Sequence, residues 1–256
     1  MSSVTGTVRA HINEAVATLV IDNAERRNAM SLAMYAAVPD AVRTIVDTPA
    51  VRAVILRGAG DVAFGAGSDI SEFRERRTGP AAVIYNEIEE RAVRAIEAIA
   101  VPVLALIHGP CMGGGAGMAL CADIRFAADD ATFAVPPAKL GVGYPAPSTA
   151  RLRAVVGVSR TKDLIFSGRV IDASEALRIG LVDFVVAKDD LDDHVAAYAA
   201  QITRNAPLTI AAAKLALNHG DTDATQAAIE ACYSSADYAE GINAFGEKRH
   251  PRFEGR

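Results

Sequence analysis

The sequence predicts an α/β fold with a helical C-terminal part, and three observations indicate it. Short apolar runs rich in β-branched residues alternate with helical patterns as far as about residue 190. Beyond that point the patterns are helical and rich in alanine. The 256 residues have 51% hydrophobic content, which is enough to bury one large core. We therefore expect a core of residues 1–190 and a helical region of residues 191–256, which forms a small domain or packs on a partner.

The first predicted strands form a hairpin, because residues 7–12 and 15–21 are separated by the turn-prone pair Asn13-Glu14. Ser31 is suited to cap a helix that runs toward Val46, and Pro39 is expected to kink or break that helix. Further buried strands are predicted at residues 51–56, 101–107, 123–127 and 182–186. Helical patterns occupy residues 80–100, 148–156, 159–166, 173–179, 189–204, 208–218 and 222–247.

Composition and charge argue against several classes of function. The formal net charge is −5, whereas binding to nucleic acid or to an acidic membrane surface needs a basic surface. The three cysteines form no CxxC pair, which fits a reducing compartment better than a disulfide framework. The N-terminus shows no export or transit signal, and no apolar run reaches the ~18 residues of a membrane span. We therefore predict a cytoplasmic protein.

Two glycine-rich segments are the candidates for a functional site: residues 64–70 (FGAGSDI) and residues 113–117 (GGGAG). Each follows a predicted buried strand and precedes a helical pattern, where a tight turn directs backbone N–H groups into a crevice. Neither fits the dinucleotide fingerprint G-x-G-x-x-G, and the chain lacks G-x-x-x-x-G-K-[ST] and G-x-S-x-G. The five histidines are scattered, so we expect no metal site.

A backbone oxyanion hole is the interpretation that remains for these two segments. One such turn alone is most simply a tight turn, but two in successive strand–turn–helix units favour a paired site. N–H donors from separate loops suit an oxygen that gains negative charge during a reaction. A thioester whose α-carbon becomes an enolate provides such an oxygen.

The chain resembles the enoyl-coenzyme A (CoA) hydratase/isomerase, or crotonase, superfamily over nearly its whole length. The resemblance lies in the order and spacing of several short motifs. They are Arg26-Arg27-Asn28-Ala29-Met30, the strand 53–56, FGAGSDI at 64–70, Pro102…His108-Gly109…Gly113-Gly114-Gly115, the stretch 121–127, Phe133…Leu140-Gly141, and the helix 239–249.

The resemblance implies a crotonase-like spiral of strand–strand–helix units, with the acyl-CoA site in residues 1–190. It implies that residues 191–256 form a helical trimerisation region, in trimers that often pair into hexamers. It also places the oxyanion donors on the N–H groups of Ser68 and Gly114. No cofactor is expected, since CoA is part of the substrate. The residues that it implies for binding CoA are Arg26, Ala29, Ala66, Asp69 and Ile70, joined by Phe245 and Lys248 of a neighbouring subunit.

The chain departs from the hydratase pattern at the acids. Hydration of an enoyl thioester uses two carboxylates to move protons. The positions where the family hydratases carry them fall at Gly117 and Pro137, and neither residue can transfer a proton. The positions of the isomerase glutamate fall around residues 144–146, again without a carboxylate.

Tyr144 is the most suggestive polar residue near the second of these loops. The stretch around it looks like the corresponding part of methylmalonyl-CoA decarboxylases, which carry a tyrosine there but a histidine where this chain has Ser68. Loss of CO2 leaves an enolate without any base, so a decarboxylase needs no carboxylate. An interface or loop role for Tyr144 fits equally well, and a non-catalytic acyl-CoA binder stays open. Glutamates of residues 71–90 are alternative acids, although most are expected on a solvated helix face.

Overall fold

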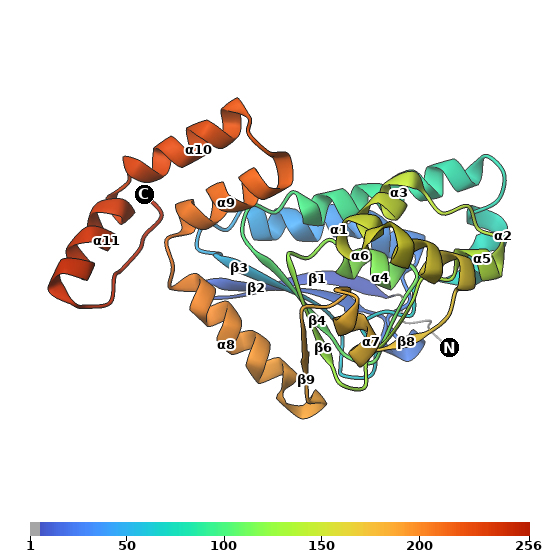
Figure 1. Ribbon diagram of the computed structural model, residues 1–256. Helices are drawn as coiled ribbons and strands as arrows, with labels where there is room; N and C mark the ends of the chain where they lie inside the picture. The colour runs from blue at the N-terminus through green and yellow to red at the C-terminus, as the bar shows by residue number, and fades with distance from the viewer. Residues whose placement is uncertain (1–5) are drawn as a thin grey trace.

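The computed structural model describes residues 6–256, and its centre is a six-stranded sheet in the order β1-β2-β3-β4-β6-β9 (Figure 1). The first pair is an antiparallel hairpin, as expected, and each later neighbour is parallel. Parallel neighbours need crossover connections, so the chain returns to the same edge after each strand and winds as a spiral. The strands are β1 (Thr7–Asn13), β2 (Val16–Asp22), β3 (Ala53–Gly58), β4 (Val103–Ile107), β6 (Ile124–Ala128) and β9 (Phe184–Val186).

A second sheet of three short strands was not predicted from the sequence. It consists of β5 (Pro110–Met112), β7 (Thr132–Ala134) and β8 (Ile171–Asp172). Strands of two or three residues are too short to show an alternating pattern, so only tertiary contacts reveal them. This sheet leads directly into the second glycine-rich segment, because β5 ends one residue before Gly113.

The helices follow the predicted order with two corrections. The predicted helix 222–247 is wrong as a single helix: it ends at Tyr233, and the Ser235 side chain accepts from Tyr238 N to begin a second one. The expected break at Pro39 is also wrong, since α1 is continuous and the Ser31 hydroxyl caps it. The helices are α1 (Leu32–Val46), α2 (Phe73–Arg76), α3 (Ala81–Glu97), α4 (Gly114–Ala119), α5 (Pro137–Leu140), α6 (Ala146–Ser167), α7 (Ala173–Arg178), α8 (Leu191–Thr203), α9 (Pro207–His219), α10 (Asp223–Tyr233) and α11 (Ala236–Glu247).

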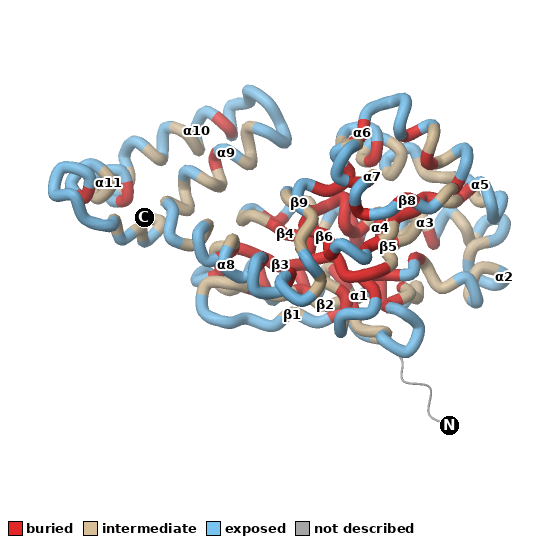
Figure 2. Tube along the Cα trace, turned by 60° about the horizontal axis from the view of Figure 1, so that its bottom comes forward, coloured by how far each residue is buried: buried red, intermediate tan, exposed pale blue. Residues whose placement is uncertain are grey.

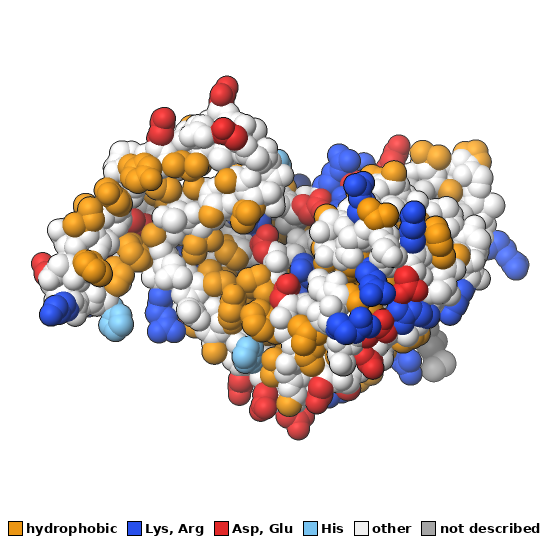
Figure 3. All heavy atoms as spheres, viewed as in Figure 1, with side chains coloured by type: hydrophobic (Ala, Val, Ile, Leu, Met, Phe, Trp, Pro, Cys, Tyr) orange, Lys and Arg blue, Asp and Glu red, His pale blue; other side chains and the backbone are white. Residues whose placement is uncertain are grey.

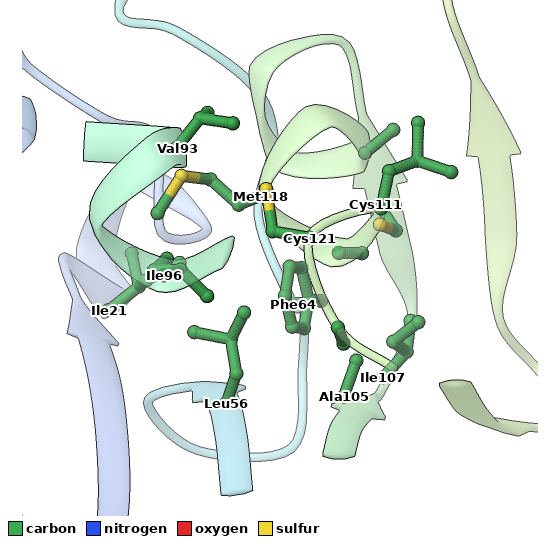
Figure 4. Close-up of a cluster of buried hydrophobic side chains, with 14 of the residues drawn as sticks. Ile21, Leu56, Phe64, Val93, Ile96, Ala105, Ile107, Cys111, Met118 and Cys121 are labelled. Atoms are coloured by element: carbon green, nitrogen blue, oxygen red, sulfur yellow. The ribbon is translucent and has the colours of Figure 1, made fainter. Parts of the chain in front are cut away.

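The sheet is covered on both faces, as Figure 2 shows by its buried central strands. Val54 and Leu56 of β3 belong to the larger core with α1 and α3, whereas Ala53 and Ile55 pack with α8. This alternation is the period-two pattern of a strand buried on both sides. Figure 4 shows Leu56 directed toward Ile96 of α3 in the larger core. Burial of such a leucine stabilises the fold by roughly 1.5–3 kcal/mol.

The C-terminal helices α9–α11 extend away from the sheet as an arm (Figure 1). Apolar side chains gather along it (Figure 3), and Leu217 and Phe245 are 86% and 87% exposed. An apolar groove of ≈ 730 Å³ runs between these helices. The boundary predicted at residue 190 falls at the start of α8, which itself packs on the sheet. The two-part division stays a prediction.

No helix within residues 6–256 combines the length and the apolar character that crossing a membrane requires. Residues 1–5, part of the N-terminal stretch on which the cytoplasmic prediction depends, lie outside the described residues.

Candidate active site

The two glycine-rich segments, far apart in the sequence, lie against each other. Gly65 forms a β-bridge with Cys111, and the Met112 N–H donates to the Gly65 carbonyl over 2.9 Å. Gly115 must lack a side chain, because a Cβ there would lie 2.5 Å from the Gly65 oxygen. The sequence prediction that these segments form one paired site is therefore consistent with their packing.

Ser68 and Gly114 are brought together at the centre of this contact. A Cβ built on Gly114 would lie 3.3 Å from Ser68 N and 2.8 Å from Ser68 Oγ. The hydrogen bonds among residues 6–256 leave the backbone N–H groups of both residues without an acceptor. Gly114 is the first residue of α4, where the first-turn N–H groups have no intrahelical partner. Two neighbouring residues thus each carry a backbone N–H group that has no acceptor among the described residues.

Two buried tyrosines stand behind Ser68, and the sequence analysis missed both. The Tyr35 hydroxyl lies 3.0 Å from Ser68 Oγ, and the Tyr35 ring packs edge-on against Tyr85 at 6.3 Å. Burial raises the pKa of Tyr85 to about 12 and raises the pKa of Tyr35 well above its usual value. Both phenols stay protonated at neutral pH. The Tyr35 hydroxyl contacts the loop that carries Ser68, whereas the Tyr85 hydroxyl is buried without a hydrogen-bond partner among residues 6–256. Buried aromatic residues on helices look like ordinary core in a sequence, so no local signal distinguishes them.

A small cavity lies beside Gly114, with room of ≈ 10 Å³, about one water molecule. Tyr144 lines it, close to the position that the resemblance predicted, and burial raises the pKa of the Tyr144 hydroxyl, which keeps its proton. Gly117 lines it as well and contributes no carboxylate at that position. Pro137 is buried at the start of α5. The full lining is Glu89, Val93, Gly113, Gly114, Gly117, Leu120, Tyr144, Ser148 and Arg151.

Glu89 is the acid that the sequence analysis undervalued. Its side chain is 16% exposed and pairs with the Arg77 guanidinium over 3.0 Å, so the expectation of a solvated helix face is wrong for this residue. Burial raises the pKa of Glu89 above its usual value, although the Arg77 charge opposes the shift. A sequence signal existed: Glu89 lies four residues after Tyr85 and four before Val93, on the buried stripe of α3. Glu87, off that stripe, is exposed.

Comparisons with known proteins show the family to which the chain belongs. The sequence model of the family described as enoyl-CoA hydratase/isomerase matches residues 11–256. The chain belongs to that family. It is 36% identical over 247 residues to the crotonyl-CoA hydratase of Syntrophomonas wolfei, covering 94% of this chain and 95% of the relative. It is 35% identical over 241 residues to the short-chain-enoyl-CoA hydratase of Clostridium acetobutylicum, covering 91% and 92%. A solved enoyl-CoA hydratase/carnithine racemase from Magnetospirillum magneticum superposes with a TM-score of 0.92 at 36% identity, covering 97% of this chain and 96% of that one.

In this family member the residues predicted for CoA lie mostly around the first glycine-rich segment. The Arg26 guanidinium pairs with the Asp69 carboxylate over 2.7 Å, and Ala66 N donates to the Arg27 carbonyl over 2.9 Å. Burial opposes ionisation of Asp69, but hydrogen bonds from Ser71 and the Arg26 charge together lower its pKa. Ala29 is half-buried beside this pair, and Ile70 is exposed. Arg26, Ala29, Ala66, Asp69 and Ile70 thus form a charged, partly exposed surface next to Ser68, which is called the ledge below.

Phe245 and Lys248 do not lie at this ledge within one chain. Both belong to the end of α11, which Figure 1 places on the arm, away from α2 and α4. Phe245 lines the apolar groove of the arm. Their contact with CoA stays a prediction that needs a neighbouring subunit.

Proposed function

We propose that this protein acts on an acyl-CoA thioester by stabilising its enolate between the N–H groups of Ser68 and Gly114. The observation that carries the proposal is that Ser68 and Gly114, whose N–H groups have no acceptor among residues 6–256, lie side by side next to a cavity in a family named for enoyl-CoA chemistry. As the α-carbon becomes an enolate, negative charge grows on the thioester oxygen. Preorganised donors hold that charge without having to reorient, and one such donor contributes ~10²–10³ in rate.

CoA in this proposal lies along the ledge of Arg26, Ala29, Ala66, Asp69 and Ile70. The Arg26 guanidinium is 59% exposed even while it pairs with Asp69, so it is accessible to phosphate oxygens. The acyl chain extends past the Arg77–Glu89 pair toward a second cavity of ≈ 530 Å³ between α2, α3 and residues 140–143. The proposal keeps the cytoplasmic location and adds no cofactor beyond the CoA of the substrate.

A second candidate reaction is decarboxylation of a malonyl-type thioester, which the position of Tyr144 favours. Departure of CO2 generates the same enolate, so it uses the same donors and needs no base. The Tyr144 hydroxyl keeps its proton and lines the cavity with Gly114, so it can donate a hydrogen bond to the departing carboxylate. The identity of the acyl group therefore decides between this reaction and chemistry at an enoyl group.

Self-association into a trimer or a dimer of trimers is part of the proposal. The arm exposes large apolar side chains along a groove, and a monomer would leave this surface in water. A cyclic assembly would cover it and bring Phe245 and Lys248 to the ledge of a neighbouring subunit.

The experiment removes one N–H donor and uses a matched control for the Cβ that the substitution adds. A Cβ at Gly114 would collide with the hydroxyls of Tyr35 and Ser68, at 2.2 and 2.8 Å, so the test uses the Tyr35→Phe, Ser68→Ala background. Gly114→Ala keeps the N–H group in that background, and Gly114→Pro deletes it. Turnover is measured with crotonyl-CoA and methylmalonyl-CoA, and binding of each thioester by calorimetry.

We expect Gly114→Pro to lose about 10²-fold or more in turnover relative to Gly114→Ala, with similar thioester affinity. Equal turnover of the two variants would contradict the role of the Gly114 donor. Binding of thioesters without turnover of any would indicate an acyl-CoA binder.

A further inference from the structure

The cavity beside Gly114 contains three titratable side chains, and only Glu89 is suited to exchange a proton near neutral pH. Arg151 is held by the carboxylates of Glu90 and Glu97, each over 2.6 Å. Burial raises the pKa of Tyr144, so its hydroxyl stays neutral. Glu89 is the remaining group, and its carboxylate is the one acid among the residues that line this cavity.

Glu89 is held in place from several elements. Arg77, the residue after α2, donates both to Glu89 and to Asn86, and its guanidinium stacks over the Tyr85 ring at 4.5 Å. A guanidinium held by an ion pair and an aromatic face has little freedom to move. The carboxylate is therefore fixed at the wall of the cavity instead of swinging into solvent.

The charges around Glu89 keep it ionisable yet basic. Burial destabilises the carboxylate most, and its neighbour Glu90 adds to this, while Arg77, which follows α2, and Arg151 of α6 stabilise it. Burial is the main cause of the raised pKa of both Tyr35 and Tyr144, and the Glu89 charge adds to it. Glu89 and Tyr144 line the same cavity. A carboxylate in such a setting is a stronger base than a solvated one.

We propose that Glu89 transfers the proton at the acyl α-carbon, in place of the carboxylates that are missing at Gly117 and Pro137. The inference rests on the proposed function, because it needs the thioester oxygen between Ser68 and Gly114. The lining of a single cavity by Gly114 and Glu89 is the geometry that carries it.

The step balances within the enzyme and substrate. A Glu89 carboxylate oxygen takes the α-proton, the electrons of the C–H bond form the C=C bond of the enolate, and the thioester oxygen takes the negative charge. Return of a proton from the neutral Glu89 carboxyl restores the thioester. For addition of water to an enoyl thioester, the Glu89 carboxylate first takes a proton from the water molecule. In the same step the water oxygen bonds to the β-carbon, and the electrons of the substrate C=C bond move to form the enolate. The same proton then passes to the α-carbon.

The test follows exchange of the α-protons of butyryl-CoA with deuterium in D2O by NMR, using the full-length protein. Glu89→Gln keeps the size of the side chain and a hydrogen-bond acceptor for Arg77 but cannot take the proton. Glu87→Gln, on the exposed face of the same helix, is the matched control. Calorimetry with butyryl-CoA checks that each variant still binds.

We expect exchange to fall about 10²-fold or more in Glu89→Gln and to stay unchanged in Glu87→Gln, with similar affinities. We also expect wild-type exchange to rise with pH as Glu89 ionises, and Arg77→Met to move that rise to higher pH, because it removes a stabilising positive charge. If Glu89→Gln folds poorly, two other variants test the role of Glu89. They are Arg77→Met, through its shifted pH dependence of exchange, and Glu89→Asp, which should keep part of the exchange activity.

Two failures are distinguishable. Exchange in Glu89→Gln at the wild-type rate, with wild-type exchange present, overturns the role of Glu89 and leaves the enolate site intact. Butyryl-CoA that binds to the wild type without exchange also overturns the role of Glu89, and it leaves decarboxylation at the same enolate site. Failure of both butyryl-CoA and methylmalonyl-CoA to bind the wild type contradicts the proposed function itself.

Discussion

Gly117→Glu is predicted to increase hydration of crotonyl-CoA, because it adds a carboxylate at a position where the sequence resemblance implies one in hydratases. Gly117 lines the cavity with Glu89 and Tyr144, and a Cβ built on it meets no atom within 4 Å. Its backbone is helical, so a side chain adds no strain. Replacing an interior helical glycine by glutamate also favours the helix by about 0.5 kcal/mol, which offsets part of the cost of a partly buried charge.

The magnitude follows from general acid–base catalysis. A positioned proton-transferring group contributes ~10²–10⁴ in rate, so hydration should rise by at least tens-fold even with imperfect placement. The wild type should be a slow hydratase, far below the diffusional ceiling of ~10⁸ M⁻¹s⁻¹ in kcat/KM. Spectrophotometric loss of the crotonyl double bond measures the rate. Gly117→Gln is the control, with the same length and no proton to exchange. Equal rates for the Glu and Gln variants would refute the idea that Gly117 occupies a proton-transfer position.

Four further predictions concern stability, assembly and CoA binding. Gly114→Ala should lower the free energy of unfolding by about 1–3 kcal/mol, because the new Cβ would lie 2.2 Å from the Tyr35 hydroxyl. The loss should be smaller in the Tyr35→Phe background, where that hydroxyl is absent. If chemical denaturation shows that Gly114→Ala costs the same in both backgrounds, the contact with Tyr35 is contradicted. Light scattering should report a trimer or hexamer at micromolar concentration, and Phe245→Asp should weaken this assembly. A wild-type monomer would contradict both the assembly and the contact of Lys248 with CoA. CoA at a hundredfold excess over its Kd should stabilise the fold by about 3 kcal/mol. Arg26→Gln should weaken CoA binding several-fold in calorimetry, and an unchanged Kd would remove Arg26 from the ledge.

The elements that were predicted correctly are those with a long local pattern. The β1–β2 hairpin has a turn signal between two apolar runs, and α1 has a serine cap and a regular apolar stripe. The two helices predicted at 148–156 and 159–166 correspond to α6, whose backbone is interrupted at Gly157. In contrast, the sequence 222–247 is helical throughout in propensity, and the break before Ser235 depends on one side-chain cap.

The residues of the candidate site also differ in whether a local sequence pattern reveals them. The glycine-rich segments were recognisable because glycine at close backbone contacts is a local necessity, as the 2.5 Å approach at Gly115 illustrates. Tyr35, Tyr85 and Glu89 were not, since their roles depend on which helix packs beside the loops. A glutamate on the buried stripe of α3 was visible in the sequence, but its partner Arg77 and the cavity that it faces arise only from the tertiary fold.

The central claim is that the thioester oxygen lies between two backbone N–H groups, and a crystal structure with a bound acyl-CoA analogue such as acetoacetyl-CoA tests it most directly. We expect the thioester oxygen within about 2.7–3.1 Å of both Ser68 N and Gly114 N, with the α-carbon facing Glu89. A thioester oxygen that lies beyond hydrogen-bonding distance of either nitrogen, with the CoA in place on the Arg26–Asp69 ledge, would contradict it.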